Sequence, residues 1–236
     1  MLLQQKIALV TGASQGIGLA IARALADEGC KLVVCCRNER QLRRVAQQLA
    51  RYDVDVLAHA CDVRDQKSVA DLFRAVRQKF RRIDILVNNA GIAHADSPAS
   101  KLPSEVWTDV IATNLTGMFL VTKAALPLMK RGGIVVNNLS IAAKQVFPGS
   151  SAYNASKHGA LGFNNTLREE LRTKGIRVIA MLPGATDTAI WNTLWPDAPR
   201  KKMLPPTAIA QALISAIKQK EGTIEEISIL PSAGAL

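Results

Sequence analysis

The chain has 236 residues, of which 48% are apolar and 21% charged, with a mean hydropathy of +0.10. This length and composition exclude a mainly disordered chain and predict one domain over residues 1–236 with a single buried core. The formal net charge of +11 is compatible with nucleic acid, an acidic partner or a phosphorylated ligand. Basic residues are interleaved with acidic and apolar ones, and aromatic residues make up 4%, so no nucleic-acid-binding tail or stripe is expected.

The cysteines and the N-terminus indicate an intracellular protein. Cys30, Cys35, Cys36 and Cys61 form no C-x-x-C spacing, so we expect buried, reduced thiols. The N-terminus lacks the basic and small-residue features of a signal peptide, and no run reaches 18 apolar residues. We therefore expect a cytoplasmic protein with no membrane segment.

Strands and helices are expected to alternate along the chain. Apolar runs rich in β-branched residues predict strands over 6–10, 31–36, 55–60, 83–87, 133–136, 176–182 and 226–230. Helical spacing between them predicts helices over 17–27, 39–51, 67–80, 104–130, 151–174 and 206–220. This order predicts an α/β fold, a doubly wound seven-stranded parallel sheet with helices on both faces. The long connection over 188–205 is expected to be a loop or short helical lid over a site.

A glycine-rich segment follows the first predicted strand and opens the first helix. Gly12 permits a tight turn, Gly16 lets the backbone approach a pyrophosphate, and Gly18 lets the helix pack close to the strand. The predicted phosphate-binding residues are Gly12, Ser14, Gln15, Gly16, Ile17 and Gly18.

The end of the second strand favours NADP over NAD as the cofactor. Cys36 stands where an NAD-selecting carboxylate is expected, and Arg37 follows it, so a 2′-phosphate is attracted rather than repelled. Because Gln15 is not basic, the phosphate would depend mainly on Arg37, helped by Asn38 or Arg40.

Five motifs in order resemble the short-chain dehydrogenase/reductase family over nearly the whole chain. They are T-G-x-x-x-G-x-G from Thr11, Asn88-Asn89-Ala90-Gly91, Asn114, the set Ser140, Tyr153 and Lys157, and Pro183-Gly184 with Thr188. The resemblance implies a Rossmann-like fold and an NAD(P)-dependent oxidoreductase. It implies further cofactor contacts at Asp62, Val63, Asn89, Ala90, Gly91, Tyr153, Lys157, Pro183, Gly184, Thr186 and Thr188. Asn88 and Asn89 are expected both to stabilise the central strands and to border the cofactor.

The catalytic prediction also follows from side-chain chemistry. Tyr153 and Lys157 are four residues apart on one helix face, and a nearby cation should lower the pKa of the phenol, which suits a general acid. Ser140 can hydrogen-bond the substrate oxygen. By resemblance, Lys157 also binds the nicotinamide ribose and Asn114 holds a water that links Lys157 to solvent. The three histidines have no acidic partners at ligand spacing, so we expect no metal site.

Four functions remain open at this point, of which the last, nucleic-acid binding, rests only on the net charge and would need a contiguous basic face. The first is an NADPH-dependent reductase of a small ketone or aldehyde, the second a 3-oxoacyl-[acyl-carrier-protein] reductase, and the third a cofactor-binding homologue without turnover. The segments 92–102, 142–150 and 188–205 would shape the substrate pocket, which Phe147, Trp191 and Trp195 make partly apolar. The surplus of apolar residues in the helix over 104–130 predicts a homo-oligomer, a tetramer or a dimer.

Overall fold

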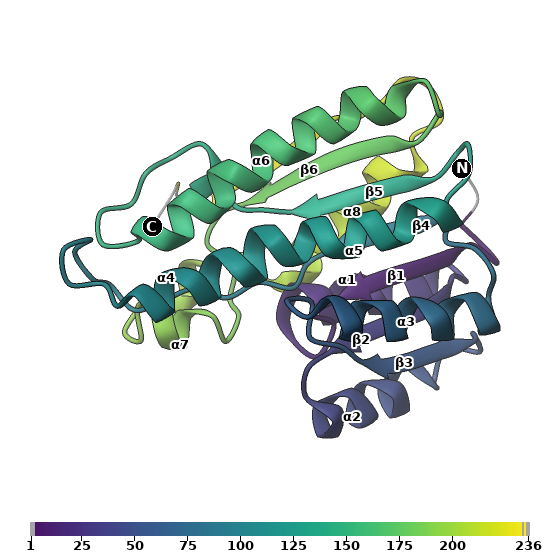
Figure 1. The fold of residues 1–236 in the computed structure, drawn as a ribbon, viewed down its shortest axis with the longest axis horizontal. Helices are drawn as coiled ribbons and strands as arrows, with labels where there is room; N and C mark the ends of the chain where they lie inside the picture. Colours follow the sequence, from purple (N-terminus) through teal and green to yellow (C-terminus); the bar gives the residue numbers. More distant parts are fainter. Residues whose placement is uncertain (1–2, 233, 235–236) are drawn as a thin grey trace.

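The computed structural model describes residues 3–232 and 234. It contains a seven-stranded sheet in the order β3-β2-β1-β4-β5-β6-β7, in which all neighbouring strands are parallel (Figure 1). The strands are β1 (Ile7–Thr11), β2 (Lys31–Cys36), β3 (Val56–Ala60), β4 (Ile85–Asn88), β5 (Ile134–Asn138), β6 (Arg177–Pro183) and β7 (Glu226–Ile229). The order reverses between β1 and β4, which is where ligands bind in sheets of this kind.

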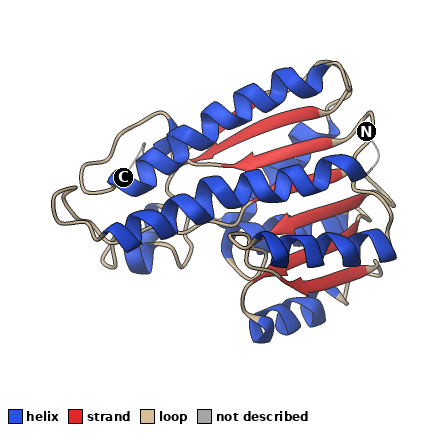
Figure 2. Ribbon diagram, viewed as in Figure 1, coloured by secondary structure: helices blue, strands red, loops and turns tan. Residues whose placement is uncertain are grey.

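Helices cover both faces of the sheet (Figure 2). They are α1 (Gly16–Asp27), α2 (Glu39–Leu49), α3 (Gln66–Lys79), α4 (Ser104–Ile111), α5 (Gly117–Ala125), α6 (Ser151–Arg172), α7 (Trp191–Leu194) and α8 (Pro206–Lys218). Alternation along the strands divides the core: Ala8 and Val10 of β1 pack with α1, α2 and α8, whereas Ile7 and Leu9 pack with α3, α5 and α6. The predicted α/β fold class and all seven strands are confirmed.

The helix predicted over 104–130 is not one regular α-helix. α4 passes into a π-helical turn (Ala112–Thr116), then into α5, and ends in a 3-10 turn (Leu126–Leu128). The π-helical turn carries Asn114, whose side chain bonds to the backbone of Ile92, and such turns often lie at functional sites. Pro127 accounts for the end of the regular helix.

The same helical segment, Ser104–Leu128, is also long and apolar enough to cross a membrane, with a mean hydropathy of 1.3 over its most apolar window. The sequence predicts no membrane segment, because none of its uninterrupted apolar runs reaches 18 residues. In the fold, α5 packs against α3 and β4, as the core helix of a globular domain does. Trp107 of α4 and Phe119 of α5 nevertheless remain 43% and 44% exposed.

Three buried amides connect β4, β5 and α6. Asn88 Nδ2 donates to Asn137 Oδ1 at 2.8 Å and to Thr122 Oγ1 at 2.9 Å, and Asn137 Nδ2 donates to Asn164 Oδ1 at 2.9 Å. Asn88 therefore stabilises the central strands as expected. The expectation that it also borders the cofactor is wrong, because its side chain faces α5 rather than the cavity described below.

The segment over 188–205 forms a small structured lid. It contains α7 and a 3-10 turn (Arg200–Lys202), and Trp191 packs with Ala185, Ala198 and Met203 in a separate apolar cluster. The Arg200 guanidinium ties the lid together by donating to Asp187 Oδ1 (2.8 Å), to the Thr188 carbonyl (2.6 Å) and to Asn192 Oδ1 (2.6 Å).

The four cysteines are buried and free, as predicted. Cys35 and Cys61 are hydrogen-bonded to each other, which raises the pKa of the Cys35 thiol and lowers that of Cys61.

Candidate active site

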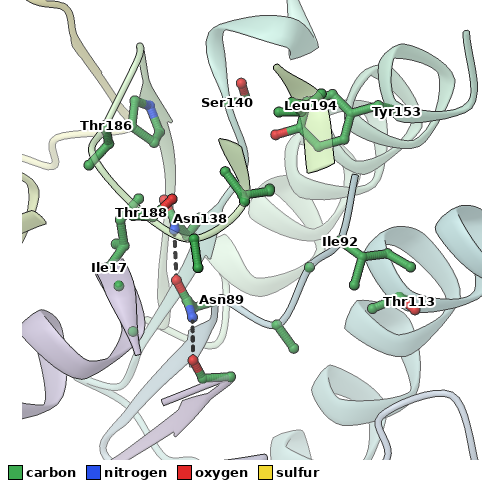
Figure 3. A pocket seen from close by; sticks show the side chains of 18 of the residues that line it. Ile17, Asn89, Ile92, Thr113, Asn138, Ser140, Tyr153, Thr186, Thr188 and Leu194 are labelled. Atoms are coloured by element: carbon green, nitrogen blue, oxygen red, sulfur yellow. Dashed lines mark hydrogen bonds between the residues drawn. The ribbon is translucent and has the colours of Figure 1, made fainter. Parts of the chain in front are cut away.

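A cavity of about 900 Å³ opens at the carboxyl edge of the sheet. Its walls come from the segments that follow β1 to β6 and from the lid, and Figure 3 shows part of its lining. Apart from Asn88 and Arg40, the residues predicted to contact the cofactor all line this cavity: Gly12, Ser14, Gln15, Gly16, Ile17, Gly18, Arg37, Asn38, Asp62, Val63, Asn89, Ala90, Gly91, Tyr153, Lys157, Pro183, Gly184, Thr186 and Thr188. Of the predicted catalytic residues, Ser140, Tyr153 and Lys157 line it and Asn114 does not.

The glycine loop fits tightly against the segment after β4. Gly12 and Gly16 have φ of +63° and +55°, in the left-handed region that favours glycine. A Cβ on Gly18 would overlap Asn89 Nδ2. The first turn of α1 has no side-chain cap, so its backbone N–H groups are free to face an anion.

Two asparagines connect this loop to β5 (Figure 3). Asn89 Nδ2 donates to the carbonyls of Thr11 (2.9 Å) and Gly12 (3.1 Å), and Asn138 Nδ2 donates to Asn89 Oδ1 at 2.8 Å. The two carbonyls can only accept, so they fix the orientation of both amides. Asn138 was not among the predicted site residues, and its one signal in the sequence is an amide at the end of an apolar strand.

At the other end of the cavity, charged side chains follow β2 and β3. Arg37 lines the cavity. The expectation that Arg40 helps to hold the 2′-phosphate is wrong, because Arg40 does not line the cavity. Asn38 Oδ1 caps α2 by accepting from Gln41 N at 3.0 Å, so that oxygen is committed to the helix. The Arg64 guanidinium binds the Asp62 carboxylate at 2.7 Å and lowers its pKa.

Tyr153 and Lys157 lie one helical turn apart on α6. Lys157 Nζ lies 5.5 Å from the centroid of the Tyr153 ring, and the Ser140 hydroxyl lies near the Tyr153 hydroxyl, where it acts to lower the pKa of the phenol. Ser140 Oγ also accepts from Ala142 N at 3.1 Å, which fixes its position. The expectation of a lowered pKa for Tyr153 is not met: burial of the hydroxyl raises its pKa, and the nearby Ser140 hydroxyl offsets this only in part.

Lys157 is 5% exposed, and burial lowers its pKa to about 8. Within residues 3–232 and 234, its ammonium has neither a hydrogen-bond partner nor a carboxylate partner. A buried ammonium in this condition favours a ligand that supplies oxygen acceptors.

Asn114 supports the site from behind. Its Oδ1 accepts from Ile92 N at 2.8 Å, and its Nδ2 donates to the Ile92 carbonyl at 2.9 Å and to Ser156 Oγ at 3.0 Å. A Cβ on Gly91 would lie 3.3 Å from Asn114 Oδ1 and 3.7 Å from Lys157 Nζ. Asn114 therefore holds the backbone that passes Lys157.

The remaining wall is mostly apolar and comes from the three segments predicted to shape the substrate pocket. Its residues are Ile92, Asp96, Ala142, Phe147, Pro148, Ser150, Ala189, Ile190, Trp191, Leu194 and Trp195. Asp96, which the sequence analysis did not single out, is the carboxylate in this wall.

The cavity fits an extended dinucleotide. Free helix N–H groups and a close-packed glycine loop lie at its middle, with Arg37 at one end and the unpartnered Lys157 ammonium near the other. Among the described residues, no group of three or more His, Cys, Asp or Glu could hold a metal ion.

Comparison with known proteins agrees with this geometry. The sequence model described as short chain dehydrogenase matches residues 6–199. An uncharacterized oxidoreductase of Staphylococcus aureus is 37% identical over 232 residues, covering 97% of this chain and 98% of that protein.

Two solved structures are similar over nearly their full lengths. The alcohol dehydrogenase of the archaeon Thermococcus sibiricus, complexed with 5-hydroxy-NADP, has a TM-score of 0.90 and 31% identity, covering 97% of each chain. A variant of actinorhodin polyketide ketoreductase with NADPH has a TM-score of 0.86 and 34% identity, covering 98% of this chain and 97% of that one.

Proposed function

This chain belongs to the short-chain dehydrogenase/reductase family, oxidoreductases that interconvert alcohols and carbonyl compounds with NAD(P), and we propose that it is an NADPH-dependent reductase of a ketone or aldehyde. The observation that carries the proposal is the Ser140–Tyr153 hydroxyl pair beside Lys157, in one cavity with the glycine loop and Arg37.

In the proposed reaction, the reduced nicotinamide supplies a hydride to the carbonyl carbon. Tyr153 gives its hydroxyl proton to the carbonyl oxygen, so that C=O becomes H–C–O–H. The raised pKa of Tyr153 keeps that proton in place at neutral pH. Ser140 donates a hydrogen bond to the oxygen as negative charge develops, and the Lys157 ammonium stabilises the phenolate that Tyr153 leaves.

The proposed cofactor placement follows the order of the strands. Arg37 would hold the 2′-phosphate, the Gly12–Gly18 loop and the α1 N-terminus the pyrophosphate, and Lys157 the nicotinamide ribose. The absence of a carboxylate at Cys36 and the pairing of Asp62 with Arg64 favour NADPH over NADH, because little negative charge opposes the phosphate.

The proposal is tested by following NADPH oxidation with a panel of ketones and aldehydes, for the wild type and for Tyr153→Phe. We expect turnover by the wild type and a loss of at least about a hundredfold in Tyr153→Phe, with NADPH affinity retained. Tight NADPH binding without turnover of any carbonyl compound would instead support a cofactor-binding homologue without catalysis.

The second candidate is reduction of a 3-oxoacyl group carried by acyl carrier protein. It is supported by the similarity to actinorhodin polyketide ketoreductase and by the net charge of +11, which would attract an acidic carrier. A rate that falls with salt for the carrier-bound substrate, but not for a small ketone, would favour it.

The proposal also covers assembly and location. The exposed Trp107 and Phe119 favour a homotetramer formed through α4 and α5. The four free, buried cysteines favour the cytoplasm as its location. A monomeric mass in sedimentation at micromolar concentration would contradict the tetramer.

A further inference from the structure

The charges that line the cavity are few and unevenly placed. Four charged residues line it, namely Arg37, Asp62, Asp96 and Lys157. Asp62 is held by Arg64 at the end of β3, and Arg37 lies at the neighbouring end of β2. Lys157 lies beside Tyr153. Asp96 is therefore the one carboxylate at the substrate end, and among the described residues it has neither an ion-pair nor a hydrogen-bond partner.

Asp96 is seated against the chain just before α6. The backbone there forms a bridge, in which Ser97 N donates to the Gly149 carbonyl at 2.9 Å. A Cβ on Gly149 would overlap Asp96 Oδ1, so only a residue without a side chain leaves room for this carboxylate. The seat lies four residues before Tyr153, at the mouth of the proton-donating site.

Three aromatic side chains, Phe147, Trp191 and Trp195, line the same wall, and hydrogen bonds hold the first two in place. The Trp191 indole N–H donates to the Thr186 carbonyl at 2.9 Å, so its polar atom is occupied and the ring can offer only apolar contact. Asn154, next to Tyr153, accepts from Phe147 N at 3.2 Å and thereby fixes Phe147. Trp195, 47% exposed, completes the wall at the entrance.

We propose that this end of the cavity selects carbonyl compounds with an aromatic or alicyclic body and a cationic or hydrogen-bond-donating substituent, and that Asp96 is the residue that determines this specificity. Asp96 is exposed at the mouth of the cavity, where its carboxylate attracts a cation and repels an anion, whereas the aromatic side chains favour a flat apolar body. The inference depends on the proposed reductase function and adds the substrate class.

The test compares three ketones of nearly equal shape: acetophenone, 4-(aminomethyl)acetophenone and 4-acetylbenzoate. For each we would measure kcat/KM with NADPH and, by calorimetry, the affinity for the NADP-saturated protein. The wild type is expected to prefer the cationic over the anionic ketone by about tenfold or more in both quantities. In Asp96→Asn this ratio should fall to within about twofold. Asp53→Asn, which removes an exposed carboxylate outside the cavity, should leave it unchanged.

The two proposals fail in different ways. Turnover of all three ketones with no dependence on charge, or equal ratios in the wild type and Asp96→Asn, would overturn the inference and leave the reductase function standing. Charge-dependent binding without turnover would support the inference and contradict the reductase function. Binding of none of the three ketones would overturn the proposed substrate class. If Asp96→Asn lowers thermal stability while the ratio stays as in the wild type, Asp96 acts only on the positive end of α6 and the inference is wrong.

Discussion

Lys157 Nζ lies 5.5 Å from the centroid of the Tyr153 ring, and its ammonium is buried without a carboxylate partner among the described residues. Burial lowers the pKa of Lys157 to about 8, against about 10.5 in the unfolded chain. The folded protein therefore binds fewer protons than the unfolded chain between these values, so this group makes stability rise with pH from about 8 to 10.5. At neutral pH the buried charge of Lys157 therefore lowers the free energy of unfolding, although the proposed reaction needs that charge.

The first prediction concerns the opposite effects of the Lys157 charge on activity and on stability. Lys157→Met should abolish reduction but raise the free energy of unfolding of the ligand-free protein at pH 7 by about 1–3 kcal/mol, because a buried charge is removed. The gain should vanish as the pH approaches 10.5. Urea unfolding across this pH range measures both quantities, with the exposed Lys174→Met as the control. If Lys157→Met lowers the free energy of unfolding instead, the buried Lys157 side chain stabilises the fold and the prediction is wrong.

The second prediction separates two neighbouring arginines. Arg37 lines the cavity and Arg40 does not, although only three positions separate them: Arg37 precedes the N-cap of α2, and Arg40 lies in its first turn. Arg37→Ala should weaken NADPH binding by about tenfold or more and leave NADH binding nearly unchanged, since a charged hydrogen bond to the 2′-phosphate is lost. Arg40→Ala should alter neither. Fluorescence titration with the two cofactors measures this, and an equal loss for both cofactors in Arg37→Ala would place the guanidinium elsewhere.

The third prediction follows from the fixed amide of Asn138. Asn138→Leu removes the hydrogen bond to Asn89 and should weaken NADPH binding by a few fold. Asn138→Asp places a carboxylate against Asn89 Oδ1, so at pH 8 its loss should exceed that of Asn138→Leu. At lower pH, the protonated carboxyl can donate as the amide does, and affinity relative to wild type should recover. Dissociation constants measured from pH 5.5 to 8 decide this; equal losses in the two variants would leave Asn138 without a positioning role.

The fourth prediction compares two glycines in helices. A Cβ on Gly18 would overlap Asn89 Nδ2 and lie 2.5 Å from the Gly12 carbonyl oxygen, whereas Gly162 in α6 has no atom within 4 Å of that position. Gly18→Ala should lower the free energy of unfolding by about 1–3 kcal/mol, and Gly162→Ala should raise it by about 0.5–1 kcal/mol. Thermal unfolding of the two variants tests the pair. A stable Gly18→Ala protein would mean that the loop can shift to make room.

Features that depend on neighbours in the sequence were predictable. The apolar strands, the glycine loop and the spacing of Tyr153 and Lys157 are each set within a few residues, and the structure places them as expected. The parallel sheet then follows from the alternation of strands and helices, because each crossover constrains the next.

Features that depend on packing between distant segments were not predictable. Asn138 and Asp96 contact residues 49 and 53 positions away, in the segment after β4 and in the loop before α6. The raised pKa of Tyr153 reflects the burial of its hydroxyl in the folded chain, and spacing along one helix carries no information about burial. The π-helical turn at Asn114 likewise results from a side-chain contact with Ile92, 22 residues earlier.

The amides of Asn88, Asn137 and Asn164 have a consequence for how β4 and β5 find their alignment. Apolar strands such as β4 and β5 offer little that distinguishes one register from the next, since Val and Ile side chains are nearly interchangeable. A slip by one residue would turn the amides of one strand away from those of the other, and a slip by two would set them opposite apolar residues such as Val135 and Leu86. Either error would strand buried amides at about 1–3 kcal/mol each. In the observed register Asn88 lies opposite Asn137, and this register is the one that lets the hydrogen bonds from Asn88 to Asn137 and from Asn137 to Asn164 form.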